Sequence, residues 1–156
     1  MKIAIASDHA GFEVKQALCK HLRAAGREVV DHGCHEAVSC DYPDLAATAA
    51  RSVAAGNEDV GILVCGTGIG VSMAANKVPG IRAAVVHDAL TTEMSRRHND
   101  ANVLCMGARA LGEAKCLELA DLWLETAFEG GRHARRVGKI DALDGAPATG
   151  DSSPSP

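Results

Sequence analysis

A cysteine followed by a run of glycines is the most informative segment of this sequence. Cys65 ends the apolar run 60–65 (VGILVC), and Gly66, Gly68 and Gly70 follow it in the loop GTGIG. Glycines let a backbone approach a ligand closely, and N–H groups at a helix start bind anions. The same donors favour a thiolate over a thiol. The segment therefore predicts an anion-binding loop beside a reactive cysteine, with a buried structural cysteine as the alternative interpretation.

This glycine loop does not match the common nucleotide-binding motifs. A Walker A loop would continue with Gly-Lys-Ser/Thr, and GxGxxG would require a third glycine at position 71, where the chain has Val71. The loop also follows the third predicted strand rather than the first. The anion is then either a phosphate or an oxyanion that forms during a reaction.

A histidine and a basic segment add further candidates. His98 and Asn99 end a predicted helix, where a histidine either stabilises the helix end or transfers protons near neutral pH. Arg132 and Arg136 are four residues apart and share one face if their segment is helical. A planar guanidinium suits a phosphate, so this basic cluster predicts an anionic partner. A solvated helix end is the alternative interpretation.

The remaining cysteines carry less chemical information. No CxxC pair occurs, so the usual zinc and thioredoxin-type signatures are absent. The spacing of the histidines and cysteines in the loop 32–40 matches no standard metal site, and we expect no metal there. The thiols on predicted helices or inside a strand are expected in the core; they are Cys19, Cys105 and Cys116.

The elements that position these residues alternate regularly between strand and helix. Helical spacing of apolar residues or helix-start signals predict helices over 12–25, 43–55, 71–77, 88–98 and 112–128. Short apolar runs predict strands over 2–6, 27–30, 60–65, 81–86 and 102–106. This alternation predicts an α/β fold with a five-stranded parallel sheet and helices on both faces.

The predicted carboxyl ends of the strands gather the polar residues at one edge of the sheet, where ligands bind in such folds. Asp8 and His9 follow the first strand, the glycine loop follows the third, and Arg109 follows the fifth. This convergence is stronger evidence for a site than any single motif.

Composition narrows the class of protein. The 156 residues carry a formal net charge of −4 and only 3% aromatic residues, which argues against a nucleic-acid-binding protein. No apolar run approaches the length of a membrane span, and the start of the chain does not read as a signal peptide. We therefore expect a cytoplasmic protein with reduced thiols and no membrane partner.

The last part of the sequence contains a long apolar helix, predicted over 112–128, and a terminal segment without apolar periodicity. The helix is apolar on more than one face, which predicts a second subunit packed on it, with a wide core face as the alternative. Residues 1–144 are expected to form one domain. The Pro/Ser/Gly-rich residues 145–156 are expected to form a disordered tail.

Motifs spread along the chain resemble a known family. They are SDHAGF, DYPD, CGTGIG followed by SMAANK, GIRA, RRHNDANVL, GAR and FEGGRH-xx-R, in order over roughly residues 1–143. This pattern resembles the type B ribose-5-phosphate isomerases of the ribose/galactose isomerase family. The resemblance implies a Rossmann-like three-layer α/β/α sandwich without metal or organic cofactor. It also implies a homodimer, in some members a tetramer, with active sites shared between subunits.

The resemblance also implies roles for individual residues. Cys65 matches the base that moves a proton between C1 and C2 of the sugar, and His98 matches the residue that opens the furanose ring. Gly66, Thr67, Gly68, Ile69 and Gly70 match the loop that holds the reacting oxygen, with Thr67 beside the base. Further substrate and phosphate contacts are implied for Asp8, His9, Asn99, Arg109, Arg132 and Arg136.

The implied activity is interconversion of D-ribose 5-phosphate and D-ribulose 5-phosphate in the non-oxidative pentose phosphate pathway. The segment HGCHEAVSC before DYPD is not a motif of the family, so the sugar end of the site is its least defined part. Allose-6-phosphate or galactose-6-phosphate isomerase activity is one alternative. A non-catalytic module that binds a phosphorylated ligand is another.

Overall fold

Short apolar runs of β-branched residues and alanine form the central sheet. The computed structural model describes residues 1–145. The strands are β1 (Lys2–Ser7), β2 (Glu28–Asp31), β3 (Val60–Cys65), β4 (Ala83–Val85) and β5 (Val103–Gly107). They pair in the order β2-β1-β3-β5-β4, and every pair is parallel. The predicted five-stranded parallel sheet is confirmed.

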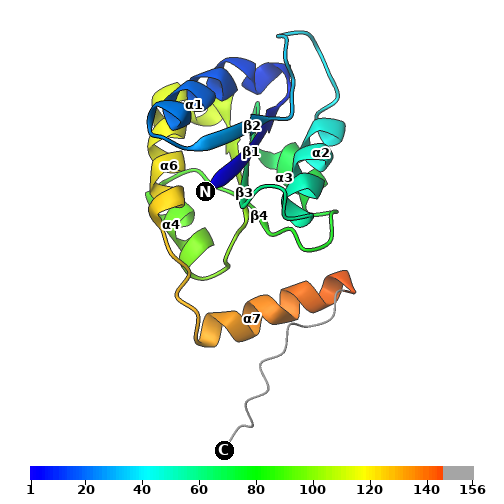
Figure 1. Cartoon of the computed structure of the whole chain (residues 1–156), viewed down its shortest axis with the longest axis vertical. Helices are drawn as coiled ribbons and strands as arrows, with labels where there is room; N and C mark the ends of the chain where they lie inside the picture. Colours follow the sequence, from blue (N-terminus) through cyan, green and yellow to red (C-terminus); the bar gives the residue numbers. More distant parts are fainter. Residues whose placement is uncertain (146–156) are drawn as a thin grey trace, which may run out of the picture.

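Helices cover both faces of this sheet (Figure 1). They are α1 (Phe12–Ala24), α2 (Tyr42–Ala54), α3 (Ile69–Ala75), α4 (Ala89–Arg97), α5 (Ala108–Leu111), α6 (Glu113–Glu125) and α7 (Arg132–Asp141), with 3-10 turns η1 (His9–Gly11) and η2 (Ala142–Asp144). Helices α1, α4 and α6 lie on one face, and α2 and α3 lie on the other. The predicted three-layer α/β/α sandwich is therefore confirmed.

Alternation along β1 and β3 divides the core into two layers. Ile5 and Ile62 pack in the cluster that includes α1 and α6, whereas Ala6 and Leu63 pack in the cluster that includes α2 and α3. All residues of β3 are buried, as its unbroken apolar run predicted. The small alanines of the second layer let α2 lie close to the sheet, which places the start of α2 near the end of β3.

Several helix ends follow the expected local rules. Gly26 has a φ of +77° just beyond α1, a left-handed conformation that glycine adopts without strain. Asp41 is the N-cap residue of α2, and Pro43 lies in its first turn. Asp88 caps α4 by accepting a hydrogen bond of 2.7 Å from the backbone N–H of Thr91. The cap therefore fixes where helix α4 begins, and the length of the helix then places its C-cap residue, His98.

Some predicted boundaries were wrong by a few residues. Helix α6 ends at Glu125 rather than at Phe128, because Thr126 is already in an extended conformation. A short helix, α5, precedes it, and Gly112 with a φ of +74° separates the two. Helix α3 begins two residues before the predicted start, and β4 is shorter than the predicted strand 81–86.

The apolar faces of α6 are covered within the chain itself. Leu119, Ala120 and Trp123 are fully buried, in a cluster shared with α1 and the sheet. The indole N–H of Trp123 donates to the hydroxyl of Ser95 over 3.2 Å, which joins α6 to α4. The wide core face accounts for these buried residues, while Leu117 and Leu122 are only partly buried.

Helix α7 belongs to neither layer and stands apart from them (Figure 1). The Arg82 guanidinium donates to Asp141 over 2.9 Å, and the backbone N–H of Gly80 donates to Asp144 over 3.0 Å. Ile140 and Leu143 are exposed, Leu143 to 85%. The predicted tail lies outside the described residues except for Gly145. Among residues 1–145, no helix has the length and apolar character that crossing a membrane requires.

Candidate active site

The candidate site lies where the carboxyl ends of β1, β3 and β5 meet. From β1 the chain first crosses to β2 on one side and then to β3 on the other, and ligands bind at such a reversal. The backbone N–H of Asp8 donates to the carbonyl of Val64 over 3.3 Å, and that of Arg109 donates to the carbonyl of Gly66 over 3.0 Å. These bonds hold the three strand ends together.

A cavity of about 490 Å³ opens at this point. Most of the residues predicted for the site line it, and these are Asp8, His9, Cys65, Gly66, Thr67, Ile69, Gly70 and Arg109. Gly68 is not among the lining residues, but its backbone N–H contacts the Cys65 thiol. The prediction that strand ends would bring these residues together is thereby supported by geometry.

The Cys65 thiol lies at the start of the glycine loop and is only 5% exposed. The backbone N–H of Gly68 donates to its sulfur over 3.1 Å. Gly68 has a φ of +81°, and its position against the backbone of Met106 leaves little room for a side chain. The glycine is thus needed for the loop conformation that aims an N–H at the Cys65 sulfur.

The neighbouring thiols differ from Cys65. Burial raises the pKa of Cys105 far above the usual range, with the nearby Cys65 as a smaller cause. Burial likewise raises the pKa of Cys116 to about 11. Cys19 is also buried, so the expectation that these three cysteines belong to the core is confirmed. Their thiols stay protonated at neutral pH and lie in the core, whereas Cys65 lines the cavity.

Asp8 and His9 reach the cavity through the turn after β1. Asp8 caps η1, and its carboxylate accepts a hydrogen bond of 3.0 Å from the backbone N–H of Gly11. A β-carbon at Gly11 would come within 2.5 Å of the Val64 carbonyl oxygen, so glycine is required there. The tight turn places the exposed His9 at the cavity mouth.

Three residues that line the cavity were not predicted individually, namely Ala10, Tyr42 and Met73. The Tyr42 ring lies over Gly70, where a β-carbon would come within 2.7 Å of it. Tyr42 belongs to the DYPD motif, which was the available signal. The loop 32–40 lies beside the site, because the N–H of Ser7 donates to the Gly33 carbonyl, yet it does not line the cavity.

Four predicted site residues lie elsewhere in the chain. His98, Asn99, Arg132 and Arg136 do not line the cavity at Cys65. Asn99 instead lines a second cavity of about 250 Å³, together with Arg82 and Ile140. Arg132 and Arg136 are exposed on α7, which is helical as their spacing required. One chain therefore holds two separate groups of predicted site residues.

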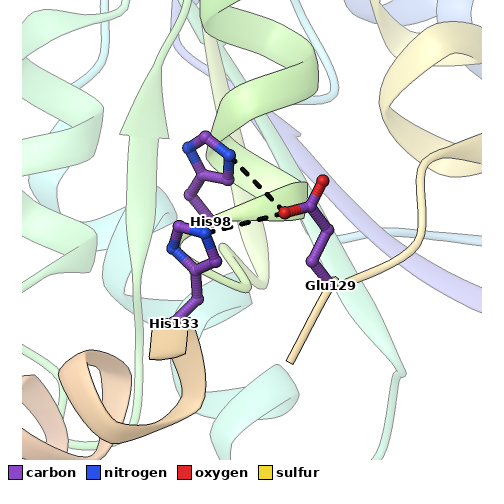
Figure 2. Close-up of side chains that lie close together, drawn as sticks. All are labelled: His98, Glu129 and His133. Carbon is purple, nitrogen blue, oxygen red and sulfur yellow. Dashed lines mark ion pairs between the residues drawn. The ribbon is translucent and has the colours of Figure 1, made fainter. Parts of the chain in front are cut away.

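His98 of the second group lies in a compact cluster with Glu129 and His133 (Figure 2). A Glu129 carboxylate oxygen lies 3.7 Å from Nε2 of His98 and 3.6 Å from Nε2 of His133. The two imidazole rings stack with centroids 4.1 Å apart and planes 3° from parallel. Ligand atoms within 4.8 Å of one another suggest a metal site at first sight. Parallel stacked rings, however, cannot direct their in-plane lone pairs at one ion, so this geometry does not fit a metal.

Comparison with known proteins identifies the family of this chain. Residues 3–140 match the Ribose/Galactose Isomerase family. The chain belongs to this family. Ribose-5-phosphate isomerase B of Escherichia coli strain K12 is 46% identical over 143 residues, which cover 92% of this chain and 96% of the relative.

Solved structures of the ribose/galactose isomerase family have the same fold. Ribose-5-phosphate isomerase B of Clostridium thermocellum superposes with a TM-score of 0.92 at 50% identity, covering 93% of this chain and 98% of that one. Ribose-5-phosphate isomerase B of Mycoplasma genitalium, solved with bound ribulose-5-phosphate, gives a TM-score of 0.89 at 42% identity, covering 94% and 97%. The family resemblance inferred from the motifs is confirmed.

Proposed function

We propose that this chain is an aldose–ketose isomerase that interconverts D-ribose 5-phosphate and D-ribulose 5-phosphate. The observation that carries the proposal is the Cys65 thiol, held by the Gly68 N–H inside a cavity that Asp8, His9 and Arg109 also line. Family membership and the relative from Escherichia coli support the substrate. The structure from Mycoplasma genitalium with bound ribulose-5-phosphate supports it further.

The chemistry of the cavity fits a proton shift between C1 and C2. The Cys65 thiolate takes the proton from C2 of the open-chain aldose, which is acidic because C1 is a carbonyl carbon. The resulting enediolate carries negative charge on oxygen, beside the loop from Gly66 to Gly70 and the Thr67 hydroxyl. Return of the proton from Cys65 to C1, with transfer of the hydroxyl proton from the oxygen on C2 to the oxygen on C1, gives the ketose. This route uses groups of the chain alone, and the proposal includes no cofactor or metal.

Ring opening and phosphate binding fall to the second group of residues in this proposal. His98 moves the proton that opens the furanose ring. Arg132 and Arg136 hold the phosphate, with Asn99 as a further contact, so that the sugar carbons stay at the base. His98→Asn should then lose more activity on the cyclic substrate than on an aldose phosphate that lacks the 4-hydroxyl and cannot close a furanose ring.

A homodimer completes the site in this proposal. The cavity at Cys65 lacks His98 and the α7 arginines of its own chain, so a second copy would supply them. Helix α7 projects from the body with Ile140 and Leu143 exposed, which suits a helix that packs on a partner. A tetramer of two such dimers is compatible with the same contacts. We also include a cytoplasmic location, because all six thiols are free and suit a reducing compartment.

The decisive experiment is a coupled spectrophotometric assay on ribose, allose and galactose phosphates. Wild type should turn over ribose 5-phosphate with the highest kcat/KM. Cys65→Ala should lose at least about 100-fold in kcat, the scale of a positioned general base. Near-normal kcat in Cys65→Ala would disprove the assignment of the base. Calorimetric binding of ribose 5-phosphate without any turnover by wild type would favour a non-catalytic binding module instead.

A further inference from the structure

The carboxylate of Glu129 faces the two stacked imidazoles from a fixed position (Figure 2). One of its oxygens accepts a hydrogen bond of 2.6 Å from Nε of Arg97, and its backbone N–H donates to the Arg97 carbonyl over 3.0 Å. Glu93, one turn earlier in α4, accepts from the same guanidinium over 2.8 Å. The segment after α6 is thereby fastened to the last turn of α4, next to His98.

The charge of Glu129 persists at neutral pH. The hydrogen bond from Arg97 holds the pKa of the Glu129 carboxyl below its usual range. Hydrogen bonds to Glu93 and then to Glu129 raise the pKa of Arg97. The second oxygen of Glu129, at 3.7 Å from His98, therefore carries negative charge throughout the pH range in which a histidine titrates.

The two imidazoles that face this oxygen are not equivalent. His133 is 6% exposed, and burial, followed by the nearby His98, lowers its pKa. Both causes favour the neutral form of His133. Its Nε2 lies 3.4 Å from the Nε–H of Arg132, which donates to it, so the proton of His133 sits on Nδ1. Two Nε2 atoms lie near Glu129, and since that of His133 accepts from Arg132, we assign the N–H that faces the carboxylate to His98.

We propose that Glu129 is a positioning residue that selects the Nε2–H tautomer of His98 and leaves Nδ1 free to exchange a proton with the sugar. A carboxylate 3.7 Å from Nε2 favours the tautomer that places the N–H, the positive end of the neutral ring, at that nitrogen. The stacked ring of His133 fixes the plane of the His98 ring, and the backbone N–H of His98 donates to Met94 over 2.9 Å. This inference depends on the proposed function for its chemical purpose, but its geometry does not.

The step that this arrangement serves is ring opening. Nδ1 of His98 accepts the proton of the C1 hydroxyl, the C1–O4 bond breaks as the C1 carbonyl forms, and the proton passes to O4. His98 is briefly an imidazolium, which the adjacent Glu129 carboxylate stabilises. The 3.7 Å separation is an ion-pair distance rather than a hydrogen bond, so the interaction strengthens as the positive charge develops.

The first test is independent of activity. Long-range ¹H–¹⁵N NMR spectra of the full chain report the tautomer of each imidazole, and the His98 signal is assigned by its loss in His98→Asn. Wild type should show Nε2–H for His98, and Glu129→Gln should shift it toward Nδ1–H or a mixture. An Nδ1–H tautomer in wild type overturns the proposal, as does an unchanged tautomer in Glu129→Gln. If Glu129→Gln does not fold, the wild-type spectrum and that of Glu129→Asp decide the question.

The second test uses kinetics on two substrates. Glu129→Gln should lower kcat/KM on ribose 5-phosphate by about tenfold or more, the scale of lost partners of a working histidine. On the open-chain analogue that lacks the 4-hydroxyl, the loss should stay within about twofold. Glu125→Gln, which removes a carboxylate paired with Arg27 instead, is the matched control and should match wild type. Equal losses on both substrates overturn the inference. Absence of isomerisation by wild type would refute the proposed function, while the NMR result would still decide the tautomer.

Discussion

Gly107 lies against Thr67 so closely that a β-carbon on Gly107 would come within 2.6 Å of the Thr67 carbonyl carbon. Gly107, the last residue of β5, thus packs against the glycine loop and is paired in register with Cys65 on β3. The position of the loop therefore depends on a missing side chain in a different strand.

Replacing Gly107 by alanine should damage catalysis more than folding. The added methyl must push the Thr67 backbone away from its place, and a displacement of about 1 Å at reacting groups costs about 100-fold in rate. We expect a loss of this size in kcat for Gly107→Ala, measured with the isomerase assay. Gly138→Ala is the control, since a β-carbon there meets no atom within 4 Å. Wild-type activity in Gly107→Ala would show that the loop tolerates the shift.

Alkylation should distinguish Cys65 from the core thiols. Iodoacetamide near neutral pH should inactivate the enzyme by labelling Cys65, and ribose 5-phosphate should protect it. Cys116, whose pKa burial raises to about 11, and Cys105, whose pKa is raised further, should stay unlabelled in the native protein. Peptide mapping by mass spectrometry checks this, with labelling in urea as the control. Inactivation without modification of Cys65 would contradict its role.

Mixing two inactive variants tests whether sites are shared between subunits. If the sites are shared, a heterodimer of Cys65→Ala and His98→Asn has one site with both changes and one site with neither. Random exchange of subunits should then restore about a quarter of the wild-type activity. Each variant carried through the same exchange alone is the control. No recovery after verified subunit exchange would place His98 and Cys65 of one chain in the same site.

The cap of α4 predicts a pH-dependent contribution to stability. Hydrogen bonds from Thr91 lower the pKa of the Asp88 carboxyl in the folded state. A lowered carboxyl pKa stabilises the fold above the unfolded-state pKa, and this is lost as pH falls through the folded-state value. Asp88→Ala should therefore lower Tm at neutral pH, and the difference from wild type should shrink in acid. Glu36→Ala, in the exposed loop 32–40, is the control for loss of a carboxylate. A constant Tm difference at all pH values would argue against the cap.

Local patterns were sufficient for most of the fold. The apolar run of β3, Gly26 after α1 and Asp88 before α4 each act within a few residues of chain, so their effects can be predicted from neighbours in sequence. The end of α6 could not, because Phe128 continues the apolar spacing while the backbone leaves the helix at Thr126. That departure is set by the need to reach α7, which is a tertiary constraint.

Reasoning from the strands predicted one group of site residues, while only the family resemblance suggested that the rest come from a second subunit. Strand-end reasoning placed Asp8, Cys65 and Arg109 together, since parallel strands must share an edge. Sequence spacing carries no information on whether His98 joins them in the same chain. Glu129 lies in the FEGGRH motif, but its proposed role depends on Arg97, which is 32 residues away in sequence, so the motif alone did not point to that role.

The ties between Arg97 and Glu129 and between Arg82 and Asp141 join α7 to the body at both ends of the helix. In the proposed dimer, the phosphate-binding arginines then stand at a set distance from the base of the other copy. The assembly would act as a ruler for the substrate. A sugar longer by one carbon would have to bend to fit between the two fixed ends, so the choice between pentose and hexose would depend on spacing between subunits as much as on the wall of either cavity.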